Sequence, residues 1–186
     1  KPVKFVEKIN LQVDFMKIID TFVPHLYAFK FSDELPDELE RVFDEWVDPM
    51  YLFQFFEANE QDLDITIEQA IDKVQKEAKF LRNKLIELAN EEPNKLNELF
   101  KNLNNNEYTA KLLQEQKARN RWLRLYAIKI DDDNYIITGG TIKLDNQHLM
   151  KDRKHTLAEL NKLNRCRDFL KDEGVIDNDS FQEIFF

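Results

Sequence analysis

The chain has 186 residues and a mass of 22.3 kDa, and its 42% hydrophobic content is enough to form the core of one domain. Its formal charge is −9, with only three glycines and one cysteine. These numbers exclude a disordered chain, an internal disulfide, a cysteine-rich zinc site and the glycine-rich loops that bind ATP or dinucleotides. No apolar run approaches the roughly 18 residues of a membrane span, so we expect a cytoplasmic protein without a membrane partner.

The negative charge is concentrated in the first part of the sequence. Residues 1–110 contain 13 Lys and Arg against 23 Asp and Glu, whereas residues 111–186 contain 14 against 13. Within residues 111–167 the numbers are 13 basic and 7 acidic. This local excess favours an anionic partner, although a solvated basic surface that balances an acidic one would have the same composition.

The first half of the sequence predicts one strand and two main helices. Residues 5–23 have no decisive period and remain unassigned. The aromatic segment HLYAFKF after Pro24 predicts a strand, and a helix begins near Pro36 with its apolar residues at helical spacing. Residues 66–89 predict a long helix of about 36 Å with one apolar stripe. That stripe favours packing within the chain, and pairing with its copy in a homodimer is the alternative.

The second half predicts a β-hairpin followed by helices. RWLRLYAIKI and YIITGGTIKL are two β-rich runs around the polar loop DDDN. A helix then begins with Thr156 as its N-cap and Glu159 as the capping-box partner, and it ends at Gly174. A last short helix near Ser180 carries two terminal phenylalanines, which must pack against another part of the chain.

The loop position sets the register of the hairpin. Ile130 faces Tyr135, and one face of the sheet then carries the pairs Trp122–Lys143, Arg124–Thr141 and Tyr126–Gly139. The opposite face carries an apolar set that suits a core: Leu123, Leu125, Ala127, Ile136, Thr138, Gly140, Ile142 and Leu144. Toward the loop the first face becomes apolar as well, at Ile128, Ile130, Tyr135 and Ile137, so only its open half is a candidate site.

Arg124 and Lys143 are diagonal neighbours in this register, about 7 to 8 Å apart at the backbone, so both side chains can reach one anion. Tyr126 and Trp122 offer stacking planes beside them, and Gly139 leaves space over the tyrosine. Basic groups interleaved with aromatic rings suit RNA. The alternative is a pair of solvated cations on a sheet surface.

The segments RWLRLYAIKI, YIITGGTIKL and KHTLAELNKL, within residues 121–163, resemble the C-terminal half of RelE/HigB-type toxins of bacterial toxin–antitoxin systems. Arg124 matches the strand arginine of that family, and Tyr126 matches the aromatic residue two positions later. Lys143 matches the lysine after the glycine-containing turn. The remaining matches are Gly139 and Gly140 for that turn and Thr156 and Glu159 for the start of the helix.

The resemblance implies an α+β fold with a small antiparallel sheet and a C-terminal hairpin, packed by helices that include one long helix. Residues 1–186 are then a single domain. Residues 33–110 form an enlarged helical insertion, and residues 111–170 form the RelE-like core of hairpin and helix.

The implied activity is that of a metal-independent mRNA endoribonuclease without a cofactor, neutralised by a helix-turn-helix antitoxin and in many cases dependent on the ribosome. Arg124 would hold the scissile phosphate, Lys143 would stabilise charge or act as an acid, and Tyr126 would stack on a base or orient the 2′-hydroxyl. The expected RNA-binding residues are Arg119, Arg121, Trp122, Lys129, His148, Arg153 and His155.

An inactive relative with the same scaffold is the competing interpretation. In that case the acidic helices of residues 33–92 and the terminal phenylalanines bind a partner protein. A solvent-reached pocket at Arg124 and Lys143 would favour the ribonuclease, whereas burial of these side chains near carboxylates would favour the interaction protein.

Three further features have simpler structural interpretations. Asp131, Asp132 and Asp133 favour a polar loop over a cation site. His25 is expected beside the first strand in a structural role. Cys166 is expected to be a small packing residue, because no base is recognisable beside it.

Overall fold

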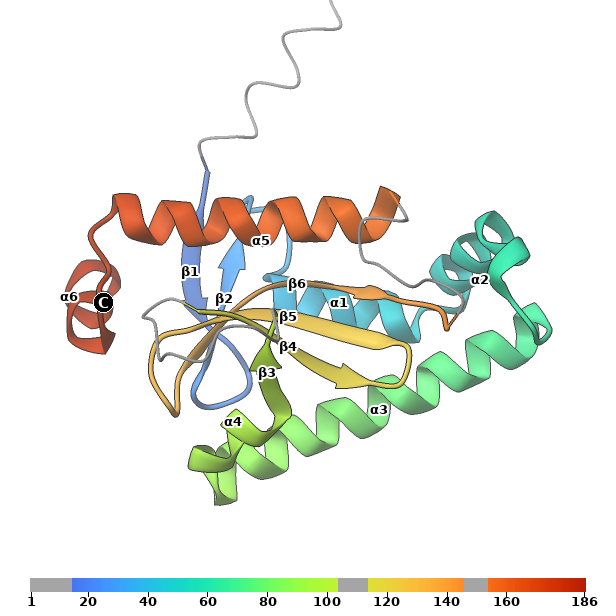
Figure 1. Cartoon of the computed structure of the whole chain (residues 1–186), viewed down its shortest axis with the longest axis horizontal. Coiled ribbons are helices and arrows are strands. Elements are labelled where there is room, and N and C mark those ends of the chain that lie inside the picture. The colour runs from blue at the N-terminus through green and yellow to red at the C-terminus, as the bar shows by residue number, and fades with distance from the viewer. Residues whose placement is uncertain (1–14, 104–113, 146–153) are drawn as a thin grey trace, which may run out of the picture.

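The computed structural model describes residues 15–103, 114–145 and 154–186 (Figure 1). In this part the protein is α+β, with six strands and six α-helices. Up to residue 103 the elements are β1 (Lys17–Asp20), β2 (Leu26–Lys30), α1 (Glu38–Val47), α2 (Pro49–Ala58), the 3-10 turn η2 (Glu60–Asp62), α3 (Ile67–Glu91), the 3-10 turn η3 (Pro93–Lys95), α4 (Leu96–Leu99) and β3 (Phe100–Asn102). The later elements are β4 (Gln114–Asn120), β5 (Leu123–Lys129), β6 (Tyr135–Ile142), α5 (Lys154–Asp172) and α6 (Asn178–Phe185).

All six strands join one mixed sheet in the order β1-β2-β6-β5-β4-β3. β2 and β6 are parallel, and every other neighbouring pair is antiparallel. A parallel pair requires a long crossover, and the chain from α1 to β5 provides it. The expectation of a small antiparallel sheet is therefore wrong, because the strand predicted after Pro24 pairs with β6 in the parallel direction.

Helices cover both faces of this sheet. α1, α2 and α3 pack on one face, in a core that includes Trp46 and Leu81. α5 and α6 pack on the other face, in a core that includes Tyr126 and Leu163. Figure 1 shows the same layers, with α5 along one side of the sheet and α3 along the other. Both sides of the central strands β5 and β6 are therefore buried.

The predicted long helix is confirmed as α3. The Thr66 hydroxyl accepts a hydrogen bond from the Gln69 N–H at 3.2 Å, and the Gln69 side chain accepts one from the Thr66 N–H at 3.0 Å. This capping box fixes the start of the helix. The apolar stripe is buried against the rest of the chain at Ala70, Val74, Ala78, Leu81, Leu85 and Leu88. A homodimer through α3 would therefore have to use a different face of the helix.

β5 and β6 pair antiparallel, with Arg124 opposite Thr141 and Tyr126 opposite Gly139 as the sequence predicts. The N–H of Lys143 donates to the carbonyl oxygen of Trp122 at 2.7 Å, which extends the same register past the end of β6. α5 and α6 follow the hairpin in the chain, and both of its strands lie inside the sheet.

The register slips by one residue beyond Tyr126, and this corrects the predicted faces. Ile128 pairs with Ile136, and no β5 residue is opposite Thr138, so Thr138 forms a bulge. As a result, Ile136 lies in the core under α5, while Tyr135 and Ile137 lie in the core under α3. The extra residue reverses the faces of the β6 side chains between the bulge and the hairpin loop, which is why the predicted faces of these three residues are wrong.

Two adjacent glycines allow helices to approach β6 from both sides. A Cβ atom at Gly140 would lie 2.9 Å from Cζ2 of the Trp46 ring on α1. A Cβ atom at Gly139 would overlap the carboxylate of Glu159 and lie 2.7 Å from the Lys162 Nζ, both on α5. Gly139 also has a φ of +153° beside the bulge, where other residues are strained. Both positions therefore require glycine.

The helices after the hairpin differ partly from expectation. α5 already includes Lys154, so Thr156 lies inside the helix and is buried rather than serving as the N-cap. Gly174 follows the end of α5 with a φ of +87°, as predicted for a helix stop. α6 begins after Asp177, which forms a capping box with Ser180.

The terminal phenylalanines pack against the chain itself. The Phe186 ring lies 5.3 Å from the Tyr27 ring of β2, and the Phe185 ring lies 6.1 Å from the Phe169 ring of α5. α6 is therefore held against β2 and α5 by aromatic contacts.

Replacing Gly140 with alanine should lower the free energy of unfolding by about 1 to 3 kcal/mol, because the new methyl group overlaps the Trp46 ring. Chemical denaturation of the full chain measures this change. Gly174→Ala is the control: nothing lies within 4 Å of its added methyl group, so only backbone strain of about 1 to 2 kcal/mol is expected. Wild-type stability in the Gly140→Ala variant would contradict the close approach.

Candidate functional site

Arg124, the central residue of the predicted site, is buried in the middle of the sheet. It retains 8% of its accessible surface. Its Nη1 donates to the backbone carbonyl oxygens of Leu123, at 2.8 Å, and of Arg121. These carbonyls turn the guanidinium back toward its own strand. A phosphate would therefore have to compete with two internal acceptors and displace covering atoms.

Tyr126 is completely buried in the core beneath α5. Desolvation raises the pKa of its phenol well above the ordinary range, and the carboxylate of Glu159 adds to this effect while Arg124 opposes it. The phenol therefore stays protonated at neutral pH. The ring packs with Ile128 and Leu163 rather than facing a site where an RNA base could stack.

The space over Gly139 is occupied by the chain itself. The side chains of Glu159 and Lys162 lie where a Cβ atom of residue 139 would be. The expectation that this glycine leaves room over Tyr126 is therefore wrong, because α5 crosses β6 at this point and fills the room with a carboxylate and an ammonium group.

These two side chains belong to an ion network that joins α5 to α1. Lys162 Nζ lies 2.6 Å from Glu38 and 2.9 Å from Glu159, and Arg41 lies 2.8 Å from Glu38 and 3.5 Å from Glu159. Arg41 also pairs with Glu45 at 2.7 Å. Every member is at least two-thirds shielded from solvent, so the network is screened less than a surface pair.

The shape of the sheet makes this network possible. β2 pairs with β6 only along Tyr135–Ile137, although β6 continues to Ile142. Among the described residues no strand pairs with the second half of β6 on its β2 side, and α1 contacts α5 past this edge through ion pairs. Burial raises the pKa of Glu159, and the nearby Lys162 and Arg41 oppose that shift.

β4 brings a further cation, Lys117, to the face of Arg124, and the sequence did not reveal this strand. Lys117 is opposite Tyr126, and position 119 is opposite Arg124, so these positions share one face. The segment QEQKARN has no apolar alternation from which a strand could be predicted. The only signal was the spacing of Lys117 and Arg119, two residues apart as in a strand. Lys143, on the other side of Arg124, is half-buried.

Trp122 lies on the opposite side of the sheet from the predicted one. Arg121 and Trp122 form a two-residue turn between β4 and β5, and Arg121 has a φ of +49°. The turn directs the indole into the core under α3, where its Nε1 donates to Asp145 at 2.8 Å. Its backbone N–H donates to Glu77 at 3.1 Å. The expectation that Trp122 shares a face with Arg124 is wrong, because the strand begins only at Leu123.

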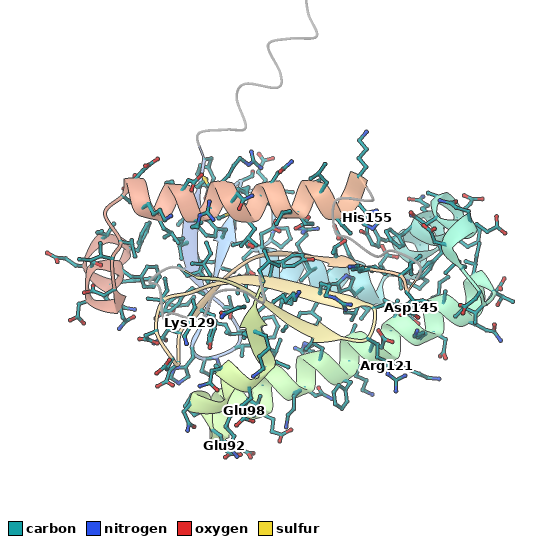
Figure 2. All side chains as sticks on the ribbon, viewed as in Figure 1. Glu92, Glu98, Arg121, Lys129, Asp145 and His155 are labelled. Atoms are coloured by element: carbon teal, nitrogen blue, oxygen red, sulfur yellow. The ribbon has the colours of Figure 1, made fainter. Side chains whose placement is uncertain are left out.

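The other expected RNA-binding residues do not form one surface. Arg121 is exposed at one end of the sheet, while Lys129 pairs with Asp132 at 2.9 Å at the other end (Figure 2). His155 lies on the Arg121 side of the molecule, where its Nε2 is 3.0 Å from the carbonyl oxygen of Ile142. His148, Arg153 and the side chain of Arg119 lie outside the described residues.

The remaining acidic and thiol candidates have structural roles. Asp131 accepts hydrogen bonds from the backbone N–H groups of Asp133 and Asn134, at 2.9 and 2.8 Å, which closes the hairpin loop. Burial raises the pKa of the Cys166 thiol, so it is protonated and unreactive at neutral pH. In residues 15–103, 114–145 and 154–186 no three His, Cys, Asp or Glu side chains are grouped to hold a metal ion.

Comparison of the chain with protein-family models, with curated proteins and with solved structures found no match. In the described part of the chain, no helix combines the length and the apolar character needed to cross a bilayer.

Replacing Glu159 with glutamine should remove a pH-dependent loss of stability. Because the folded state raises the pKa of this carboxyl, the folded chain binds its proton more tightly than the unfolded chain. The contribution of Glu159 to the free energy of unfolding is therefore most favourable below the ordinary glutamate pKa. It declines as the pH rises through the pKa that Glu159 has in the folded chain, by at most about 1.4 kcal/mol per pH unit.

Urea unfolding of both proteins as a function of pH tests this sign. The stability of Glu159→Gln relative to wild type should rise with pH just above the ordinary glutamate range and then level off. Glu183→Gln, which changes an exposed carboxyl on α6, should show no such rise. Parallel pH profiles for wild type and Glu159→Gln would contradict the assignment.

Proposed function

We propose that this chain is a protein-interaction module built on a RelE/HigB-like scaffold, and that its hairpin does not cut RNA. One observation carries the proposal. Arg124 and Tyr126 are buried, and the space above Gly139 is filled by Glu159 and Lys162, which are tied to α1. A site for RNA cleavage needs a phosphate at the arginine and a nucleotide over the glycine, and both positions are occupied by the chain.

The surface around α2 supports partner binding. Residues 42–72 contain nine Asp and Glu and no Lys or Arg. Within this stretch Val47, Met50 and Phe53 are 48%, 64% and 42% exposed. Met50 and Phe53 are three residues apart on α2, so they share one side of the helix. Exposed apolar side chains with only acidic neighbours in sequence favour a cytoplasmic partner that offers apolar and basic side chains.

The terminal phenylalanines contact rings of their own chain more than they offer a surface to a partner. Phe181 is completely buried, and Phe185 and Phe186 contact rings of their own chain. Their main role is to attach α6 to the sheet. The partner surface is therefore assigned to α2 rather than to the C-terminal residues.

A metal-independent mRNA endoribonuclease of a toxin–antitoxin system is the second candidate. Lys117 favours it, because this residue joins Arg124 and Lys143 on one face of three neighbouring strands. In that reaction the RNA 2′-hydroxyl attacks the adjacent phosphate and the 5′-oxygen leaves with a proton, so cations that stabilise the extra negative charge are useful. The mechanism requires Glu159 and Lys162 to move away from Gly139 when RNA binds.

The interaction proposal is tested by purifying a tagged full chain from its native cells and quantifying the proteins that bind it. The double variant Met50→Ser, Phe53→Ser should lose the bound partner by at least about tenfold, because it removes apolar hot-spot contacts. Ile176→Ser, which changes a 62% exposed side chain between α5 and α6, should retain the partner. Equal recovery with the double variant would contradict the proposed surface.

The same preparations distinguish the ribonuclease. Wild type should release no more new RNA 5′ ends from mRNA, with or without ribosomes, than the Arg124→Ala and Lys143→Ala variants. Two variants are needed because Arg124 is buried and its replacement affects folding, whereas Lys143 is half-buried. Cleavage by wild type that both substitutions abolish would overturn the proposal in favour of the toxin.

A further inference from the structure

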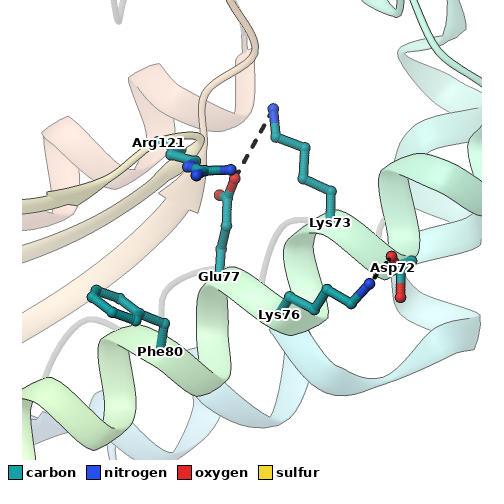
Figure 3. Close-up of a pocket in the computed structure, with 6 residues that line it drawn as sticks. All are labelled: Asp72, Lys73, Lys76, Glu77, Phe80 and Arg121. Carbon is teal, nitrogen blue, oxygen red and sulfur yellow. Dashed lines mark hydrogen bonds and ion pairs between the residues drawn. The ribbon is translucent and has the colours of Figure 1, made fainter.

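A pocket opens between α3 and the β4–β5 turn, on the side of the sheet opposite α5 (Figure 3). Its volume is about 410 Å³, within the range of small-ligand sites. The lining residues are Asp72, Lys73, Lys76, Glu77, Phe80 and Arg121. It is separate from the buried face of Arg124, because Arg121 and Trp122 turn the chain between the two places.

Contacts among Glu77, Lys73 and Trp122 fix one side of the pocket. The Glu77 side chain is buried and accepts a hydrogen bond from the Trp122 N–H at 3.1 Å. Lys73 Nζ lies 3.9 Å from Glu77 and 3.4 Å from the centre of the Trp122 ring. Desolvation raises the pKa of Glu77, while the Trp122 N–H, Lys73 and Arg121 oppose that shift. The ammonium of Lys73 is thus fixed between a carboxylate and an indole.

The charges of the pocket favour an anion. Three cations and two carboxylates line it, and Lys76 pairs with Asp72 at 2.6 Å. Lys73 and Arg121 both act on the Glu77 carboxylate, and the six lining residues together have a formal charge of +1. A guanidinium at a turn suits a phosphate, to which it can donate two parallel hydrogen bonds.

An aromatic ring stands beside these charges. Phe80 is 63% exposed, one helical turn from Glu77 on the same side of α3. A phenylalanine this exposed contributes little to the core, but it presents a flat apolar face at the pocket wall. An anion and an adjacent ring plane together match a ligand that has a phosphate and a planar base.

We propose that this pocket binds a nucleotide, with the base stacked on Phe80 and the phosphate held by Arg121 and Lys73. Stacking on aromatic side chains and cationic contacts to phosphate are the two interactions by which proteins hold nucleotides without reading their sequence. The nucleotide is either a free mononucleotide or one unit of a single-stranded RNA. This inference is independent of the proposed function, because none of its residues belongs to the hairpin face of Arg124 or to the surface of α2.

Calorimetric titration of the full chain with AMP, adenosine and a five-nucleotide oligoadenylate tests the proposal. AMP should bind at least about tenfold more tightly than adenosine, because only AMP has the phosphate. Phe80→Ala and Arg121→Gln should each weaken AMP binding by about tenfold or more. Both side chains are exposed, so these variants should fold, and circular dichroism checks that they do. Arg167→Gln on α5 is the matched control and should bind AMP as wild type does.

The two ligand lengths distinguish the source of the nucleotide. Tighter binding of the oligoadenylate than of AMP, lost in the same two variants, assigns the pocket to single-stranded RNA. Equal affinities for AMP and for the oligoadenylate assign the pocket to a free nucleotide. No binding of AMP or oligoadenylate at millimolar concentration, or unchanged binding in both variants, would overturn the proposal.

Discussion

The close approach of two helices to β6 is the constraint on which the structure depends. Gly140 admits the indole of Trp46 from α1 on one face of the strand, and Gly139 admits Glu159 and Lys162 from α5 on the other. A side chain at Gly140 would meet the Trp46 ring and the Arg124 carbonyl oxygen, and one at Gly139 would displace the ends of the Glu159 and Lys162 side chains and strain the backbone. The ion network between α1 and α5 then covers the edge of β6, and every residue of this strand is buried although two of them have no side chain.

This constraint also explains why the face of the hairpin that carries Arg124 and Tyr126 is covered. Arg124 and Tyr126 have the predicted partners on β6, Thr141 and Gly139. Glu159 and Lys162 of α5, however, cover Gly139, where the proposed RNA site would need room for a nucleotide. The accessible features lie elsewhere. Apolar and acidic side chains dominate the α2 surface, and cations beside an exposed ring line the α3 pocket.

The parts of the fold that the sequence predicted are those determined by local periodicity. The α3 stripe and the pairing of Arg124 with Thr141 both follow from spacing alone. The bulge at Thr138 was not predicted, although the glycine beside it, Gly139, is a residue type that often marks a bulge within a strand. β4 was missed because it has no apolar alternation. For the site, the sequence identified the cations but could not show their burial. The exposed Phe80, on the polar side of α3, was the one signal of the pocket that went unused.

Solvent paramagnetic relaxation, measured by NMR on the full chain with a neutral gadolinium chelate, tests the closed hairpin face most directly. The account predicts strong broadening of the Arg121 side-chain signals, and little broadening of the Arg124 Hε and the Tyr126 ring signals. Equal broadening at Arg121, Arg124 and Tyr126 would show that solvent reaches the hairpin face, and would contradict the account.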